Sequence, residues 1–107
     1  MGEFSKKYSV RGIRGATTVE SNSRDLIKDA TKELLEDMVS KNEVLSEDIA
    51  AVFFTTTSDI SDEFPAVAAR EMGWDTVPLI CGHEMAVPHG LAKCIRILIL
   101  WNTETKQ

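Results

Sequence analysis

Two arginines alternate with glycines near the start of the chain, in the run Arg-Gly-Ile-Arg-Gly-Ala-Thr-Thr at residues 11–18. The planar guanidinium of arginine can bind a carboxylate through two parallel hydrogen bonds, and glycine lets the backbone approach a ligand or bend sharply. The run therefore predicts a site for a carboxylate or a phosphate. Arg-Gly pairs also occur in tight turns without any ligand, so both interpretations stay open at this point.

Three further motifs follow: Phe-Pro-Ala-Val-Ala-Ala-Arg at residues 64–70, Val-Pro-Leu-Ile-Cys-Gly-His-Glu-Met at 77–85, and Gly-Leu-Ala-Lys-Cys-Ile-Arg at 90–96. In this order the four motifs, which span about residues 10–103, resemble the monofunctional chorismate mutases of the AroH class. The resemblance implies a homotrimeric pseudo-α/β-barrel with active sites at subunit interfaces. It also implies conversion of chorismate to prephenate in the biosynthesis of phenylalanine and tyrosine.

The chemistry of that reaction limits what the protein must supply. Chorismate carries two carboxylates, an enolpyruvyl ether and a hydroxyl, and its rearrangement breaks one C–O bond and forms one C–C bond without proton transfer. An enzyme can accelerate it by holding a compact conformer and by placing fixed positive charge at the ether oxygen. We therefore expect no cofactor, no metal and no covalent nucleophile.

By the resemblance, three residues carry the reaction. Arg96 meets the ether oxygen and a substrate carboxylate, Glu84 accepts a hydrogen bond from the substrate hydroxyl and orients a nearby arginine, and Arg14 binds the ring-side carboxylate region. A charged side chain within an apolar strand also needs a partner. An ion pair between Arg96 and Glu84 is thus the purely structural alternative.

The resemblance assigns three more residues to substrate binding. Phe64 and Arg70 are implied to come from across a subunit boundary, and Cys81 is implied to place its thiol near the substrate. The alternatives are ordinary helix packing for Phe64, a surface cation for Arg70 and a plain buried cysteine for Cys81. We expect Arg11 to face solvent or a neighbouring chain, and Lys93 to be exposed to solvent.

Composition bounds the other possibilities. The 107 residues, 43% of them hydrophobic, suit one domain at residues 10–107 after a flexible leader at 1–9. Only 7% are aromatic, and a cavity inside so small a subunit would remove packing, so a site between subunits is favoured. The net charge of -5 argues against nucleic acid as a partner.

Cysteine and histidine usage adds two exclusions. Cys81 and Cys94 have no Cys-X-X-Cys spacing, and the chain has neither a signal-peptide pattern nor an apolar stretch of about 18 residues, so we expect a cytoplasmic protein without membrane contact or disulfide. His83 and His89 lie six residues apart in a loop, which is a poor metal-binding pattern.

The periodicity predicts an α+β fold, a mixed β-sheet with helices packed on one side. Residues 49–57 are apolar enough on both faces to form a central strand. The other expected elements are strands at 10–13 and 17–19 around a corner, a helix at 23–41 capped by Asn22 or Ser23, a helix from 61 to Gly73, a strand at 77–80, a helical turn at 91–94 and a last strand at 95–101. The stripe of the first helix consists of Leu26, Ala30, Leu34 and Met38, flanked by Ile27, Leu35 and Val39.

The family pattern continues after Thr103 with a tyrosine that contacts the substrate and one more strand, whereas this chain ends at Gln107. We expect this difference to uncover apolar surface on Ile97, Ile99 or Trp101 and to weaken activity. Two other functions stay open: a non-catalytic trimer that binds a small carboxylate metabolite, and an imine deaminase of similar trimeric fold. The run at residues 11–18 argues against the deaminase.

Overall fold

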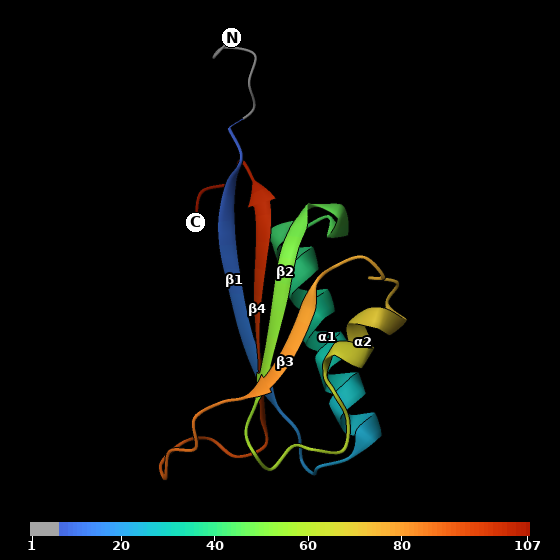
Figure 1. Ribbon diagram of the computed structural model, residues 1–107, viewed down its shortest axis with the longest axis vertical. Coiled ribbons are helices and arrows are strands. Elements are labelled where there is room, and N and C mark those ends of the chain that lie inside the picture. Colours follow the sequence, from blue (N-terminus) through green and yellow to red (C-terminus); the bar gives the residue numbers. More distant parts are fainter. Residues whose placement is uncertain (1–6) are drawn as a thin grey trace.

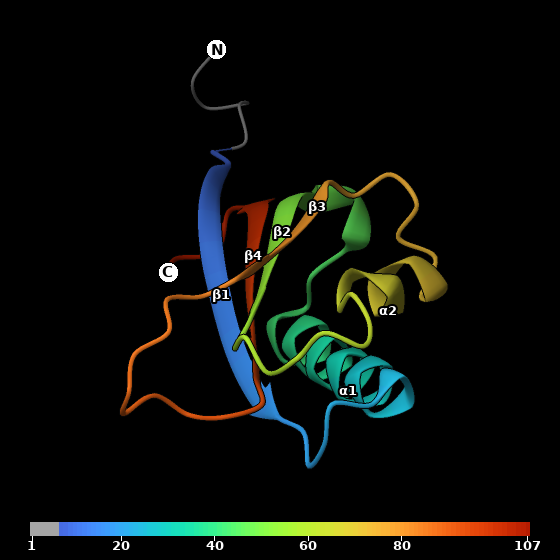
Figure 2. The same ribbon diagram turned by 60° about the horizontal axis from the view of Figure 1, so that its bottom comes forward.

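A four-stranded sheet with two helices on one face makes up the computed structural model, which describes residues 7–107 (Figures 1 and 2). The elements are β1 (Ser9–Thr18), α1 (Arg24–Asn42), the 3-10 turn η2 (Ser46–Asp48), β2 (Ile49–Thr56), α2 (Ala66–Glu71), β3 (Leu79–His83) and β4 (Cys94–Thr103). The expected α+β fold with helices on one side is confirmed. Of the expected leader at residues 1–9, positions 1–6 lie outside the described part, and β1 already begins at Ser9.

The sheet is mixed, with strand order β1-β4-β2-β3. β4 runs antiparallel to both neighbours, and β2 pairs with β3 in parallel. The interior place of β2 confirms its prediction as a central strand. The prediction that Ile97, Ile99 or Trp101 is uncovered is wrong, because β4 is also interior and all three side chains are buried toward the helices.

The expected corner at the Arg-Gly run is absent, because β1 is one unbroken ten-residue strand paired with β4 from Ser9 to Thr18. Gly15 serves packing instead. A Cβ atom on Gly15 would lie 2.9 Å from the Met38 sulfur and 3.0 Å from a Leu34 methyl carbon. Gly15 therefore lets α1 approach β1 closely.

Helix α1 matches its expected range to within one residue. The Ser23 hydroxyl accepts a hydrogen bond from the Leu26 N–H at 3.4 Å and caps the helix. The buried stripe, however, is Ile27, Thr31, Leu35 and Met38. Leu26 remains 41% exposed, so the expected stripe is displaced by one position except at Met38. Periodicity missed Thr31, whose hydroxyl is satisfied inside the helix by the Ile27 carbonyl at 2.6 Å.

The second helix is shorter than expected, because residues 61–65 are not helical. The Asn22 side-chain oxygen accepts hydrogen bonds from the N–H groups of Ser61 and Asp62 at 2.9 and 3.0 Å, which holds this segment as a loop. The predicted end at Gly73 is confirmed by its φ of 90°, a left-handed conformation that favours glycine.

Two smaller expectations are wrong. β3 spans Leu79–His83 rather than residues 77–80, since its parallel pairing with β2 runs from Val52 opposite Leu79 to Thr56 opposite His83. Residues 91–94 form no helical turn, and an irregular loop at 85–93 leads into β4. No helix in the described range 7–107 has the length and apolar character needed to cross a membrane.

The side of the sheet away from the helices, here called the open face, is uncovered in the single chain (Figure 2). Strand alternation and the pairing register arrange its side chains in rows, one of which contains Ile80, Phe53, Leu98 and Arg14. The three apolar members of this row are all exposed. The next row contains Gly82, Thr55, Arg96 and Ala16.

Replacing Gly15 with valine should destabilise the fold, because the new side chain would overlap Met38 and Leu34. We expect the free energy of unfolding to fall by about 1–3 kcal/mol in urea titrations. Gly12→Val is the matched control, since a Cβ there meets only Leu98 and Leu100 at ordinary distances of 3.4 and 3.6 Å. Both changes alter strand propensity equally, so equal unfolding midpoints would contradict the packing role of Gly15.

Candidate functional site

An ion pair on the open face joins Arg96 of β4 to Glu84, the residue directly after β3. The Arg96 Nε lies 3.1 Å from Glu84 Oε2 and 3.3 Å from Oε1. This hydrogen bond raises the pKa of the Arg96 guanidinium above its ordinary value. The expected need for a partner to a charged side chain in this apolar strand is confirmed.

The ion pair engages only one of the donors of Arg96. Its two Nη groups have no hydrogen-bond partner among residues 7–107, and the side chain is 48% exposed. A guanidinium carries five N–H donors, so four remain for a ligand. The ion pair with Glu84 and a role in binding an anion are therefore compatible rather than alternative.

Arg14 lies on the same face as this pair. Strand pairing places Arg14 opposite Leu98 and Arg96 opposite Ala16, so the two arginines are diagonal neighbours on adjacent strands, about 7–8 Å apart at the backbone. The Arg14 side chain is exposed and makes no hydrogen bond or ion pair within the described residues. Two arginines and one glutamate thus lie on the same face of the sheet, and the Arg14 side chain has no carboxylate partner within the described residues.

A cavity of about 230 Å³ adjoins the ion pair. Arg96 and Glu84 form part of its wall, and the loop at residues 85–92 supplies apolar side chains, among them Met85, Val87 and Leu91. An apolar wall beside a charged group lowers the local dielectric and strengthens its interaction with a bound anion. The cavity combines charge with apolar surface, as a small organic acid requires.

The other three predicted site residues lie elsewhere in the chain. Phe64 and Cys81 line a second cavity of about 410 Å³ on the helix side of β3. Phe64 lies outside α2 and is 68% exposed, so ordinary helix packing is wrong for it. Burial raises the pKa of the half-buried Cys81 thiol, which favours the neutral form. Arg70 lies in the last turn of α2 and donates to the Trp74 carbonyl oxygen.

Three residues outside the predicted site also have defined positions. Arg11 is half-buried and its Nε donates to the Thr105 carbonyl oxygen at 3.2 Å. That it faces solvent or a neighbouring chain stays a prediction. Lys93 is half-buried rather than fully exposed. The His83 Nδ1 lies 3.1 Å from the Thr56 hydroxyl. Over residues 7–107, no three histidine, cysteine or acidic side chains are grouped so that they could hold a metal ion.

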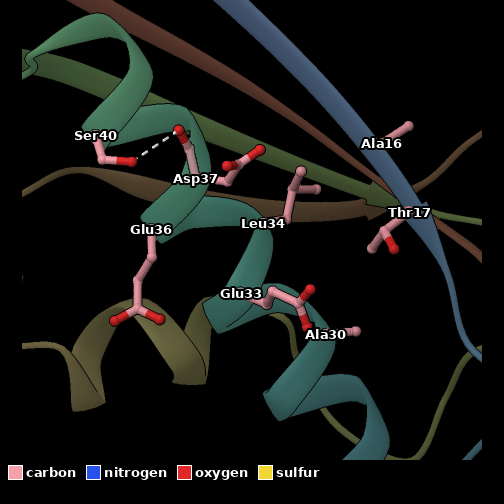
Figure 3. A pocket seen from close by; sticks show the side chains of 8 residues that line it. All are labelled: Ala16, Thr17, Ala30, Glu33, Leu34, Glu36, Asp37 and Ser40. Atoms are coloured by element: carbon pink, nitrogen blue, oxygen red, sulfur yellow. Dashed lines mark hydrogen bonds between the residues drawn. The ribbon is translucent and has the colours of Figure 1, made fainter.

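A larger cavity is a poor site for an anion. It measures about 540 Å³ and lies between α1 and β1 (Figure 3). Its walls contain Glu33, Glu36 and Asp37, without a lysine or an arginine. Acidic side chains repel a negatively charged ligand, so the arginines of the open face are a better place for an anion than this cavity.

Comparison with known proteins gives the family of the chain. The profile of the family described as chorismate mutase type I matches residues 10–107. The chain belongs to this family. It is 50% identical to chorismate mutase AroH of Thermus thermophilus over 99 residues, covering 92% of this chain and 81% of that one. It is 43% identical to chorismate mutase AroH of Bacillus subtilis (strain 168) over 99 residues, covering 92% and 78%.

A solved structure agrees with this assignment. The chorismate mutase from Clostridium thermocellum superimposes with a TM-score of 0.89 at 44% sequence identity, covering 91% of this chain and 87% of that one. The AroH-class resemblance seen in the four motifs is thus confirmed, and so is the sheet-and-helix architecture of the single chain.

One cluster of this chorismate mutase-family domain escaped the sequence analysis. Both Asp59 carboxylate oxygens accept the Lys93 N–H, at 3.0 and 3.1 Å, and the Thr57 hydroxyl donates to Asp59 while accepting the Cys94 N–H at 2.9 Å. These bonds fix the chain two residues before Arg96. The only signal in the sequence is a Thr-Ser-Asp turn after an apolar strand.

Asp59→Asn should weaken the fold in a pH-dependent way. The hydrogen bond from Thr57, together with the Lys93 N–H, lowers the pKa of the Asp59 carboxyl. A lowered folded-state pKa adds stability above the unfolded value of about 4 and loses it as pH falls through the folded value. We expect a lower thermal midpoint than wild type at pH 7, and midpoints that converge once the pH falls below the lowered folded-state pKa of Asp59.

The exposed Asp75, changed to asparagine, provides the matched control for this titration. A constant difference between wild type and Asp59→Asn from pH 7 down to acid unfolding would refute the proposed ionic contribution.

Proposed function

We propose that the chain catalyses the rearrangement of chorismate to prephenate, in the biosynthesis of aromatic amino acids. The observation that carries the proposal is that Arg14 lies on the same face of the sheet as the ion pair between Glu84 and Arg96. Membership of the chorismate mutase family and the names of its relatives support the same reaction. The alternative, a non-catalytic carboxylate-binding module, has no comparison in its favour.

The proposed roles of Arg96, Arg14 and Glu84 follow from their hydrogen-bond donors and acceptors. The Nη groups of Arg96 would stabilise the negative charge that develops on the ether oxygen as the C–O bond breaks. Arg14 would hold a carboxylate of the substrate and restrict it to the compact reactive conformer. Glu84 would accept a hydrogen bond from the substrate hydroxyl. No proton moves, so the reaction needs no general base.

Arg96→Lys should lower kcat by at least about 100-fold, because lysine keeps the charge but loses the planar fork of donors. The loss of chorismate absorbance in the ultraviolet measures turnover, and circular dichroism checks folding. Arg11→Lys is the control, since Arg11 contacts a carbonyl group outside the site. An Arg96→Lys enzyme with most of its turnover would contradict the electrostatic mechanism, and a wild-type chain that binds chorismate without consuming it would refute the reaction itself.

We also infer that the active form is a homotrimer with sites between subunits. In the single chain, Phe64 and Cys81 line a different cavity from Glu84 and Arg96, so the predicted residues do not form one pocket. The open face supplies a surface for association, with Phe53, Ile80 and Leu98 exposed side by side. Large exposed apolar patches are typical of protein interfaces. The arrangement supports Phe64 and Arg70 reaching the Arg96 site of a neighbouring subunit.

Leu98→Glu should dissociate this assembly, because it places a charge in the middle of the proposed interface. Analytical ultracentrifugation should show a trimer for wild type and mainly monomer for the variant, with a large loss of turnover. Leu26→Glu is the matched control, since Leu26 on α1 has nearly the same exposure, 41% against 38% for Leu98. A monomeric wild type, or a Leu98→Glu variant that remains trimeric, would argue against the interface.

A cytoplasmic location completes the proposal. Cys81 and Cys94 are both free thiols, which suits a reducing compartment.

A further inference from the structure

The hydroxyl of Thr55 contacts the carboxylate of the site. Thr55 lies on the interior strand β2, directly opposite Arg96 and between it and Gly82 in one row of the open face. Its Oγ1 donates to Glu84 Oε2 at 3.1 Å. The family resemblance gave Thr55 no role, and in the sequence it reads as part of a β-branched strand.

Glu84 makes two hydrogen bonds with β2, one through its backbone and one through its side chain. Its backbone N–H donates to the Thr56 carbonyl oxygen at 2.9 Å, which extends the pairing of β2 and β3 by one residue. Its side chain is held by Thr55. Since threonine is branched at Cβ and stiff about χ1, a half-buried Thr55 on an interior strand is a rigid donor.

The hydrogen bonds around the Glu84 carboxylate leave Oε1 and the Nη groups of Arg96 largely unused. Oε2 accepts from both Thr55 and the Arg96 Nε, at 3.1 Å each, whereas Oε1 has only the longer contact of 3.3 Å to the same Nε. Oε1 therefore keeps the greater capacity to accept a hydrogen bond. A carboxylate held at Nε also stays away from the paired Nη donors of Arg96, which would otherwise bind it bidentately.

We propose that Thr55 is a positioning residue, whose hydroxyl holds Glu84 against the Nε of Arg96 so that Oε1 and the Nη groups stay available to the substrate. This inference rests on the proposed chorismate mutase activity. Without the hydroxyl, the Glu84 carboxylate can rotate to the Nη pair and compete with the substrate for those donors. Transition-state stabilisation should then suffer more than folding.

Thr55→Val removes the hydroxyl but keeps the shape and the strand propensity. We expect kcat to fall about tenfold, the loss of one hydrogen bond to a charged group, with a smaller change in KM. Thr55→Ser restores the hydroxyl and should recover kcat to within about threefold of wild type. Thr76→Val is the control, because Thr76 is exposed and precedes β3, at the opposite end of that strand from Glu84.

A double variant links the effect to the carboxylate. In a Glu84→Ala background, Thr55→Val should lower kcat no further, since residues that act through one another are not additive. A wild-type kcat in Thr55→Val, an equal loss in Thr55→Ser, or additive losses in the double variant would each overturn the role of Thr55. The proposed function is tested separately, because it fails only if the wild-type chain itself does not convert chorismate.

Discussion

The arrangement of this domain depends on a charged side chain placed on an interior strand. β4 has partners on both edges, and its odd-numbered residues form the apolar core against the helices, so a charge is tolerated only on the opposite side. Arg96 occupies that side and is neutralised through one nitrogen by Glu84. The order of strands allows this pairing, since the Glu84 side chain at the end of β3 reaches across β2 to Arg96 on β4.

The core and the candidate site lie on opposite faces of the sheet, so the stability of the fold depends little on the site residues. The helices cover one face and bury the side chains that stabilise the subunit, while the ionic groups lie on the other face, where the charged heads remain hydrated until a ligand or another subunit covers them. The acidic cavity between α1 and β1 belongs to the helix side and repels anions. The two arginines of the candidate site therefore lie on the face that the helices leave open.

Periodicity predicted the fold class and the first helix, because these depend on local patterns. The family resemblance singled out Arg14, Glu84 and Arg96, and the sheet places them on one face, while their catalytic roles stay a prediction. What failed depends on contacts remote in sequence. Asn22 holds residues 61 and 62 out of the second helix, and pairing with β4 keeps the Arg-Gly run straight. The contacts of Thr55 with Glu84 and of Asp59 with Lys93 could not be predicted, since each joins residues about 30 positions apart in the sequence.

The two-residue repeat of β4 has an evolutionary consequence. The odd-numbered residues of β4 contribute to the stability of the subunit, whereas Arg96 and its even-numbered neighbours contribute to the proposed reaction and assembly. Substitutions at one parity can accumulate while the other property stays constant. A single inserted or deleted codon within the strand would exchange the two sets at once, whereas the irregular loop at residues 85–93 is where length variation between homologues can be absorbed.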